Sequence, residues 1–94
     1  INSNFFLLIN GVIYTPPLSD GCVAGSMRKL LIDIINKEYD LKIQSISNSQ
    51  IEESEEIILS NAITGVRRVT SFENRTYSEE AFYNFLIKSL NKLI

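Results

Sequence analysis

The sequence predicts a single mixed α/β (α+β) domain of about five strands and two long helices. Apolar residues recur at helical spacing in two segments, near residues 25–39 and after Ser78, and each stripe predicts an amphipathic helix. Short β-prone apolar runs, bounded by turn residues, predict the strands. A chain of 94 residues is long enough for one domain at most.

A β-hairpin is predicted at the start of the chain. The apolar run 5–9 and the β-prone run 12–15 flank the dipeptide Asn10-Gly11. Asn-Gly is favoured where both turn positions need a positive φ, so it strongly indicates a hairpin. Pro16 and Pro17 end the second arm because proline cannot donate to a strand ladder. The first arm is apolar throughout, so both of its faces are expected to be covered.

The middle of the chain predicts a loop over 18–25, a helix over 25–39 and a short strand over 41–47. Residues 48–55 form a polar turn or one helical turn, with Ser49 and Glu52 placed as a capping box. A buried strand over 56–60 then leads into a turn at 61–65. A further strand over 66–72 and a final helix capped by Ser78 follow. The apolar stripe of that helix comprises Phe82, Phe85, Leu86, Leu90 and Leu93.

Composition excludes several classes of function. The net charge of −2 gives no electrostatic case for binding nucleic acid or an anionic membrane. The absence of histidine removes the commonest general base and most zinc sites, so no metal site is predicted. Cys22 has no second cysteine to pair with, which fits a reducing cytoplasm. No apolar run is long enough to span a bilayer. The opening on Ile1, with Met27 as the sole methionine, suggests missing upstream sequence.

Two segments are candidate ligand sites. Residues 20–28 place Gly25 and Ser26 at a helix start, where free N–H groups and the helix dipole suit a phosphate. Residues 60–65 place small polar residues directly after a buried strand, a common position for a ligand crevice. Each pattern alone is more often structural, an ordinary helix start in the first case and a turn in the second.

Other polar and aromatic groups are predicted to be structural. Arg67 and Arg68 fall on opposite strand faces, which favours a surface ion pair over an anion site. The carboxylates at 52–53 and 55–56 are adjacent in sequence, as in a solvated edge. The aromatic residues that are assigned first to the core are Phe5, Phe6, Tyr14, Phe82 and Phe85.

The chain carries a series of short motifs whose order is informative. They are Ser3-Asn4-Phe5-Phe6, Asn10-Gly11, Tyr14-Thr15-Pro16-Pro17, Gly21, Gly25-Ser26-Met27-Arg28 and Glu56-Ile57-Ile58-Leu59-Ser60-Asn61-Ala62. This order resembles the class IV aminotransferase family of fold-type IV pyridoxal-phosphate enzymes. The family pattern is S-N-[IL]-F, a hairpin, T-P, G-[IS]-x-R opening a helix, and E-[IV]-F-x-x-[NG]-[AST]. This resemblance covers nearly the whole chain.

The resemblance implies pyridoxal 5′-phosphate as the cofactor, and it assigns site residues. Gly25, Ser26 and Met27 would bind the cofactor phosphate, the latter two through main-chain N–H groups. Asn61 and Ala62 would also approach the cofactor, and the segment Asn61, Ala62 and Ile63 would meet the substrate carboxylate. Both candidate segments are therefore expected to reach one ligand.

The resemblance also implies that residues 1–94 are the C-terminal, larger-lobe portion of a longer enzyme. The family's Schiff-base lysine lies upstream of S-N-x-F, so no catalytic residue is expected in this chain, and the chain alone is expected to be inactive. None of the lysines present matches that motif, namely Lys29, Lys37, Lys42, Lys88 and Lys92.

The function expected of the parent is that of a 4-amino-4-deoxychorismate lyase, which releases pyruvate and 4-aminobenzoate for folate synthesis. Asn61-Ala62 resembles the lyase branch, because a hydroxyl residue often replaces Ala62 in the aminotransferases. A branched-chain or D-amino acid aminotransferase is the alternative within the family. A non-catalytic α+β interaction module is the alternative from another class. The expected partners are a small-molecule substrate and a second copy of the enzyme in a cytoplasmic homodimer.

Overall fold

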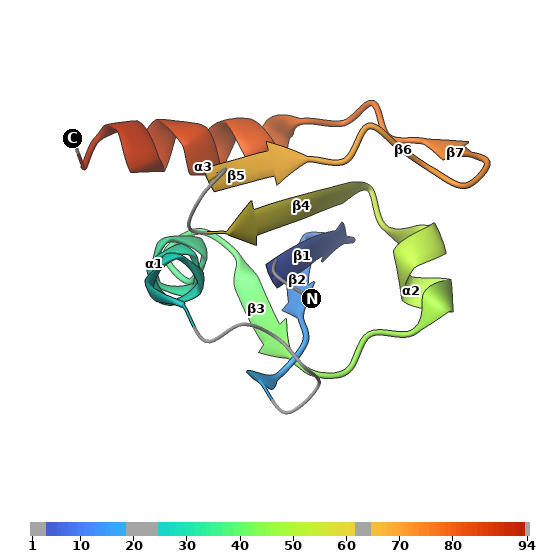
Figure 1. Cartoon of the computed structure of the whole chain (residues 1–94), viewed down its shortest axis with the longest axis horizontal. Coiled ribbons are helices and arrows are strands. Elements are labelled where there is room, and N and C mark those ends of the chain that lie inside the picture. The colour runs from blue at the N-terminus through green and yellow to red at the C-terminus, as the bar shows by residue number, and fades with distance from the viewer. Residues whose placement is uncertain (1–3, 19–24, 62–64, 94) are drawn as a thin grey trace.

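A five-stranded mixed sheet forms the centre of the computed structural model, which describes residues 4–18, 25–61 and 65–93. The strand order is β3-β2-β1-β4-β5 (Figure 1). The bounds are β1 Asn4–Ile9, β2 Val12–Thr15, β3 Asp40–Ile43, β4 Glu56–Asn61 and β5 Gly65–Arg68. Every neighbouring pair is antiparallel except β2 and β3, which are parallel. A parallel pair needs a crossover connection, and helix α1 (Ser26–Ile35) lies within it.

The predicted hairpin is confirmed. Asn10 has a φ of 49° and Gly11 a φ of 80°, the two positive values that the tight turn requires. The turn sets the register, in which Leu8 lies opposite Ile13. Phe6 and Leu7 point to opposite faces of the sheet and both are fully buried, so the centre of the first arm is covered on both sides.

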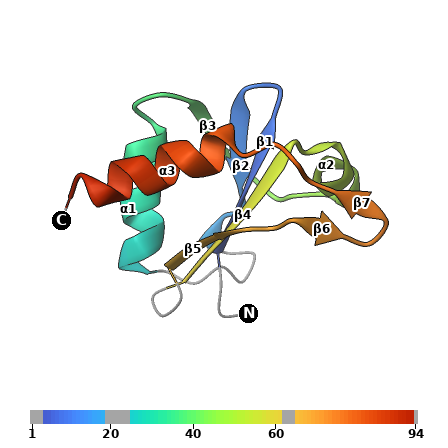
Figure 2. The same ribbon diagram turned by 90° about the horizontal axis from the view of Figure 1, so that it is seen from above.

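Two helices cover one face of the sheet and enclose the main core. They are α1 and α3 (Ala81–Asn91), which cross on the same side of the strands (Figure 2). Burial of apolar area at this interface is the main favourable term in folding. The fully or nearly fully buried core residues are Phe6, Ile13, Leu31, Ile34, Ile35, Ile58, Phe82 and Leu86.

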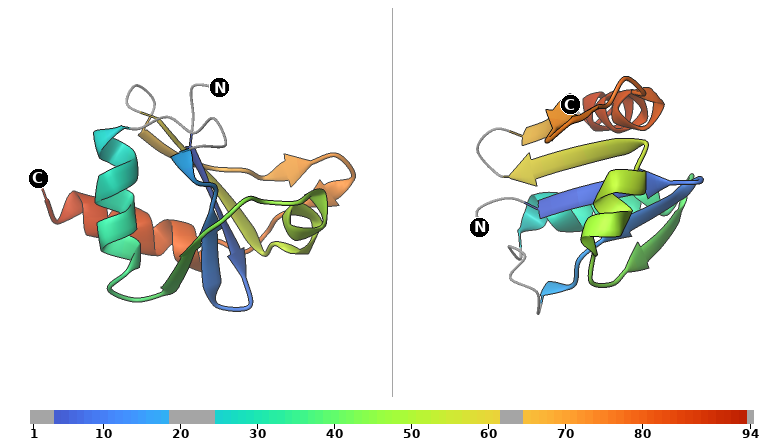
Figure 3. Two further views of the ribbon diagram at one scale, coloured as in Figure 1. Left: turned by 90° about the horizontal axis from the view of Figure 1, so that it is seen from below. Right: turned by 90° about the vertical axis from the view of Figure 1, so that its right-hand side faces the viewer.

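The opposite face of the sheet is covered more thinly. Helix α2 (Asn48–Glu53) and a small hairpin of β6 (Ser71–Phe72) and β7 (Arg75–Thr76) lie on that side (Figure 3). Leu59 remains 38% exposed there and Phe72 45% exposed. A wholly apolar hollow of about 250 Å³ is lined by Phe5, Leu7, Ile51, Ile57, Leu59, Val69 and Phe72.

Helix α1 is shorter than the predicted segment 25–39. It ends at Ile35, and the chain turns before β3 begins at Asp40, directly beside Val12. Tyr39 lies in this turn, with its ring edge-on to Phe82 and Phe85 at centroid distances of 5.1 and 5.4 Å. Tertiary packing of Tyr39 and the start of strand pairing therefore end the helix, and neither is visible in local periodicity.

The predicted capping box of the short helix was placed on the wrong residues. In α2 the Ser47 hydroxyl accepts from the Gln50 N–H at 3.2 Å, and the Gln50 side chain accepts from the Ser47 N–H at 2.9 Å. Ser49 and Glu52 have the same spacing and lie inside the helix instead. Two overlapping motifs of the same spacing are present here, and Ser47 rather than Ser49 is the N-cap.

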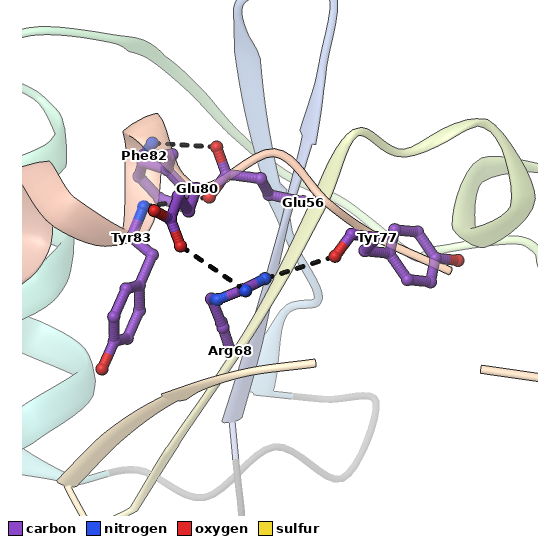
Figure 4. Close-up of polar contacts among 6 residues, drawn as sticks. All are labelled: Glu56, Arg68, Tyr77, Glu80, Phe82 and Tyr83. Carbon is purple, nitrogen blue, oxygen red and sulfur yellow. Dashed lines mark hydrogen bonds and ion pairs between the residues drawn. The ribbon is translucent and has the colours of Figure 1, made fainter. Parts of the chain in front are cut away.

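The predicted strand 66–72 is divided into β5 and β6. At the division, Arg68 forms an ion pair with Glu80 at 3.5 Å and donates from Nη1 to the carbonyl oxygen of Tyr77 at 3.2 Å (Figure 4). The surface ion pair expected at Arg67 and Arg68 is thus confirmed for Arg68.

The prediction that Ser78 caps the last helix is wrong. Helix α3 begins at Ala81, and its free N–H groups are bound by the carboxylate of Glu56 from β4 (Figure 4). Glu56 accepts from the Phe82 N–H at 2.8 Å and from the Tyr83 N–H at 3.0 Å. Glu56 is 2% exposed, so the expectation of a solvated edge is also wrong for this residue. A carboxylate at a helix N-terminus is favoured by both hydrogen bonding and the dipole.

Tyr39 packs beside this cap. Burial raises the pKa of the Tyr39 phenol, and the nearby negative charges of Glu56 and Glu38 raise this pKa further. The helix stripe is confirmed at Phe82 and Leu86, which are fully buried, whereas Leu93 near its end is exposed.

Replacing Glu56 should loosen α3. Glu56→Ala removes two charge-assisted hydrogen bonds and leaves two amides buried, so the free energy of unfolding should fall by about 3 kcal/mol. Glu56→Gln retains one acceptor and should cost about half as much. Urea unfolding measures both changes. Glu53→Ala, at an exposed position of α2, is the control and should change stability by less than about 0.5 kcal/mol. An equally small effect of Glu56→Ala would contradict the assigned cap.

Candidate functional site

The start of α1 and the end of β4 lie at the same end of the sheet. Figures 2 and 3 show this arrangement from opposite sides. The topology explains it, since β2 runs toward this end and α1 returns from it to begin β3 beside Val12. Strand β4 runs antiparallel to β1 and pairs Ser60 with Asn4, so β4 finishes where β1 begins. The described parts of the two predicted ligand segments, 25–28 and 60–61, therefore lie at the same end of the sheet, although more than 30 residues separate them in sequence.

Among the described residues, no side chain caps the start of helix α1. Its N-cap is Gly25, in an extended conformation with φ −115° and ψ 159° and with no side-chain cap hydrogen bond. That turn contains no acidic residue, but it carries the cations Arg28 and Lys29. Acidic residues normally favour this position and cations oppose the helix dipole. Within the part of the chain that the structure describes, no carboxylate neutralises these two positive charges, and such a helix start suits an anion.

The other two helices of the described chain are capped by side chains. The reciprocal pair Ser47 and Gln50 caps α2, and the carboxylate of Glu56 caps α3. The described residues therefore supply a carboxylate or hydroxyl oxygen at the starts of α2 and α3 and none at the start of α1.

A surface hollow of about 400 Å³ opens at the start of α1. Its lining residues are Leu18, Gly25, Ser26, Arg28, Lys29 and Ile32. A Cβ placed on Gly25 would meet nothing within 4 Å, so the glycine leaves open space beside the helix start rather than avoiding a clash within the chain. This space is large enough for a phosphate group to approach the main chain.

The predicted site residues are placed as follows. Gly25 and Ser26 line the hollow, while the Met27 side chain packs against the main core. Asn61 is the last residue of β4 and pairs with Gly65 of β5. Ala62 and Ile63 lie outside the described residues. The part that each residue plays toward a ligand stays a prediction.

Sequence reasoning missed two polar contacts at this end of the molecule. Arg28 reaches from α1 to the end of β2, where Nη2 donates to the Pro16 carbonyl oxygen at 3.2 Å. The fully buried Thr15 hydroxyl donates to the Phe5 carbonyl oxygen at 2.8 Å and joins the ends of β1 and β2. For the Thr15 contact the available signal was a polar residue at the end of the β-prone run 12–15.

Within residues 4–18, 25–61 and 65–93, no three acidic or cysteine side chains come together as metal ligands. No helix among these residues has the length and apolar character that crossing a membrane requires.

The motif order and this geometry agree with a family comparison. A family model described as amino-transferase class IV matches residues 1–72. The chain belongs to the class IV aminotransferase family. No curated protein matches the chain in sequence.

Solved structures share the fold over almost the entire chain. A Legionella pneumophila protein described as a 4-amino-4-deoxychorismate lyase is 30% identical, with a TM-score of 0.87 over 96% of this chain and 34% of its own. The branched-chain amino acid aminotransferase of Escherichia coli is 19% identical, with a TM-score of 0.90 over 98% of this chain and 32% of its own. An aminotransferase from Brucella abortus with bound pyridoxal phosphate is 16% identical, with a TM-score of 0.89 over 98% of this chain and 33% of its own.

These comparisons confirm the mixed α/β architecture of fold-type IV enzymes. The chain spans about a third of the length of the structures that it matches. Lyases and aminotransferases both share the fold, so architecture does not separate the two activities.

Gly25→Ala should leave the fold intact and narrow the hollow beside the first helical turn. A φ of −115° is ordinary for alanine, so the free energy of unfolding should change by less than about 1 kcal/mol. The added methyl should weaken binding of inorganic phosphate roughly tenfold, about 1.4 kcal/mol. NMR titration of the main-chain amides measures this affinity. Ser26→Ala is the matched control, because it removes a side chain and keeps the amide, and it should bind as the wild type does. Equal affinities for Gly25→Ala and the wild type would contradict close approach at Gly25.

Proposed function

We propose that this chain is the cofactor-phosphate-binding portion of a pyridoxal-phosphate enzyme that acts as a 4-amino-4-deoxychorismate lyase. Family membership supports the choice of cofactor, as does the bound pyridoxal phosphate of the Brucella abortus protein. The lyase assignment is supported by the 30% identity to the Legionella pneumophila protein and by the dipeptide Asn61-Ala62.

The uncapped start of α1 carries the proposal. A phosphate monoester has a charge of about −1.5 to −2 at neutral pH and three acceptor oxygens. The N–H groups of the first helical turn can donate to those oxygens, and the Arg28 and Lys29 side chains supply positive charge at the same point. An anion bound here would accept hydrogen bonds from the first-turn N–H groups of α1. Its negative charge would also offset the repulsion between the two cations and the positive end of the helix dipole.

The proposal assigns each segment a task. The Ser26 and Met27 amides hold the phosphate, while Gly25 keeps the approach open. The segment from Asn61 through Ala62 and Ile63 approaches the cofactor and the substrate carboxylate at the end of β4. Bound pyridoxal phosphate supplies an electron sink for breaking bonds at the carbon that bears the substrate nitrogen. The role of this chain is binding and orientation, which fix the reacting groups relative to one another.

The remaining parts of the reaction belong to a longer parent enzyme. The Schiff-base lysine and the carboxylate that pairs with the pyridine nitrogen are proposed to precede the S-N-x-F motif. The parent is proposed to be a cytoplasmic homodimer that supplies 4-aminobenzoate for folate synthesis. The 94-residue chain alone should therefore bind the phosphate without catalysing turnover.

A branched-chain or D-amino acid aminotransferase is the second candidate within the family. Its support is the close fold similarity to the Escherichia coli branched-chain enzyme, with a TM-score of 0.90. Both candidates use the same phosphate cradle and differ in the substrate that the parent accepts.

Titration of the 94-residue chain with pyridoxal phosphate tests the cofactor site. The Ser26 and Met27 amide resonances should shift, and inorganic phosphate should displace the ligand and shift the same amides. Pyridoxal without its phosphate is the matched control and should leave these amides unchanged at equal concentration. Unperturbed amides at the start of α1 would reject the site and favour the non-catalytic interaction module.

The activity is tested in the parent enzyme. Incubation with 4-amino-4-deoxychorismate should release 4-aminobenzoate and pyruvate, both measurable by chromatography. Amino transfer to 2-oxoglutarate without 4-aminobenzoate release would overturn the lyase assignment in favour of the aminotransferase.

A further inference from the structure

Besides the main-chain amides of α1, buried polar side-chain atoms lie at this end of the molecule. Three buried side-chain atoms of the described residues have no hydrogen-bond partner: Asn4 Oδ1, Arg28 Nε and Ser60 Oγ. Leaving such a group unpaired costs about 1–3 kcal/mol, and native proteins contain few of them. Ordered water or a bound ligand is the usual partner of such atoms in native proteins.

Asn4 and Ser60 are direct neighbours. They lie opposite each other in the β1–β4 register, which places their Cβ atoms about 4.5–5.5 Å apart. Asn4 is 3% exposed and Ser60 is 1% exposed. Each shares a strand face with the residue two positions along, Phe6 and Ile58, and those two belong to the core beneath α1. The two polar side chains therefore point to the α1 side, at the end of the sheet where α1 begins.

Arg28 approaches the same region from the helix. It lies three residues before Leu31 and seven before Ile35, both fully buried, so its side chain leaves the sheet-facing side of α1. Its bond to the Pro16 carbonyl oxygen holds it over the end of β2. The Thr15 hydroxyl in turn binds the Phe5 carbonyl oxygen, next to Asn4. The Arg28 side chain and the Asn4–Ser60 pair thus belong to the same end of the sheet, on the face that α1 covers.

The charge at this end of the sheet favours an anion. Arg28 contributes a guanidinium group, and no described carboxylate forms an ion pair with it. The Ser60 hydroxyl can donate or accept, whereas Asn4 Oδ1 can only accept. A dianion cannot contact Asn4 Oδ1 directly, but a water between them can donate to both. A water with the Asn4 oxygen, the Arg28 Nε–H or Ser60 hydroxyl, and a phosphate oxygen as neighbours has the usual number of partners.

We propose that Asn4, Arg28 and Ser60 are positioning residues that hold a phosphate group, through a bridging water, from below the start of α1. This assignment rests on the proposed phosphate site and adds three side chains to it. In this arrangement the main-chain amides of α1 bind the phosphate directly. The three side chains bind the water molecule that contacts its other side. The three atoms gain their hydrogen bonds when the anion is present, so they contribute to affinity and not to the stability of the free chain.

Removing the Ser60 hydroxyl separates this role from a structural one. In the ligand-free chain, Ser60→Ala removes an unpaired group, so the urea midpoint should stay unchanged or rise. The same change should weaken inorganic phosphate binding about fivefold, as expected for one lost hydrogen bond of about 1 kcal/mol. The readout is the phosphate-induced shift of the Ser26 and Met27 amides.

Two matched variants sharpen the comparison. Thr15→Val removes a buried hydroxyl at the same end of the sheet that already has a partner, so it should lower the urea midpoint. Arg28→Lys keeps the positive charge but removes Nε, and it should weaken phosphate binding by a similar factor to Ser60→Ala. An Arg28→Lys variant that binds as tightly as the wild type would show that charge alone suffices and would overturn the role of Nε.

The outcomes distinguish this inference from the proposed function. If wild-type chain does not bind inorganic phosphate or pyridoxal phosphate at α1, both proposals fail. If the wild type binds but Ser60→Ala and Arg28→Lys bind equally well, the phosphate site stands and the role of the three side chains is rejected. A Ser60→Ala chain that unfolds, or whose urea midpoint falls as far as that of Thr15→Val, would show that the hydroxyl is structural and would also reject that role.

Discussion

The parallel pairing of β2 with β3 is the constraint on which the rest of the molecule depends. Because β2 ends at Thr15 and β3 must begin at the opposite end of the sheet, the chain has to return across one face, and α1 lies in that return. The start of α1 is thereby fixed beside the ends of the strands. The antiparallel pairing of β1 with β4 places Ser60 and Asn61 at the same end. The candidate site follows from strand order before any side chain is considered.

Helix capping then distinguishes the site from the rest of the fold. At α3 the cap is a carboxylate of this chain, Glu56, which is buried and fully engaged by two amides. At α1 the corresponding groups face a hollow, and the nearest charges are cationic. The physical principle is the same at both helices, since a negative group satisfies the positive end of the helix dipole. In α3 the protein supplies that group, whereas at α1 we propose that a bound phosphate supplies it.

The fold could be predicted in outline because its strongest signals are local. Asn10-Gly11 specifies the hairpin by demanding positive φ at two consecutive residues, and the structure has both values. Apolar stripes identified α1 and α3 because the core requires a continuous face on each helix. The boundaries were less accurate. Periodicity carried α1 to residue 39, but the ring of Tyr39 packs against α3 outside the helix.

The sequence by itself determined the hairpin, the two long helices, the candidate segments at Gly25–Met27 and after Ser60, and the resemblance to a family. Each depends on residues within a few positions of one another, or on the order of short motifs. Only the tertiary structure decided that Glu56 caps helix α3, where it binds the amide of Phe82, 26 residues further along the chain. It also decided that Ser60 of β4 lies opposite Asn4 of the neighbouring strand β1. These contacts join residues distant in the chain, and their formation depends on strand order and register, which local propensity does not encode.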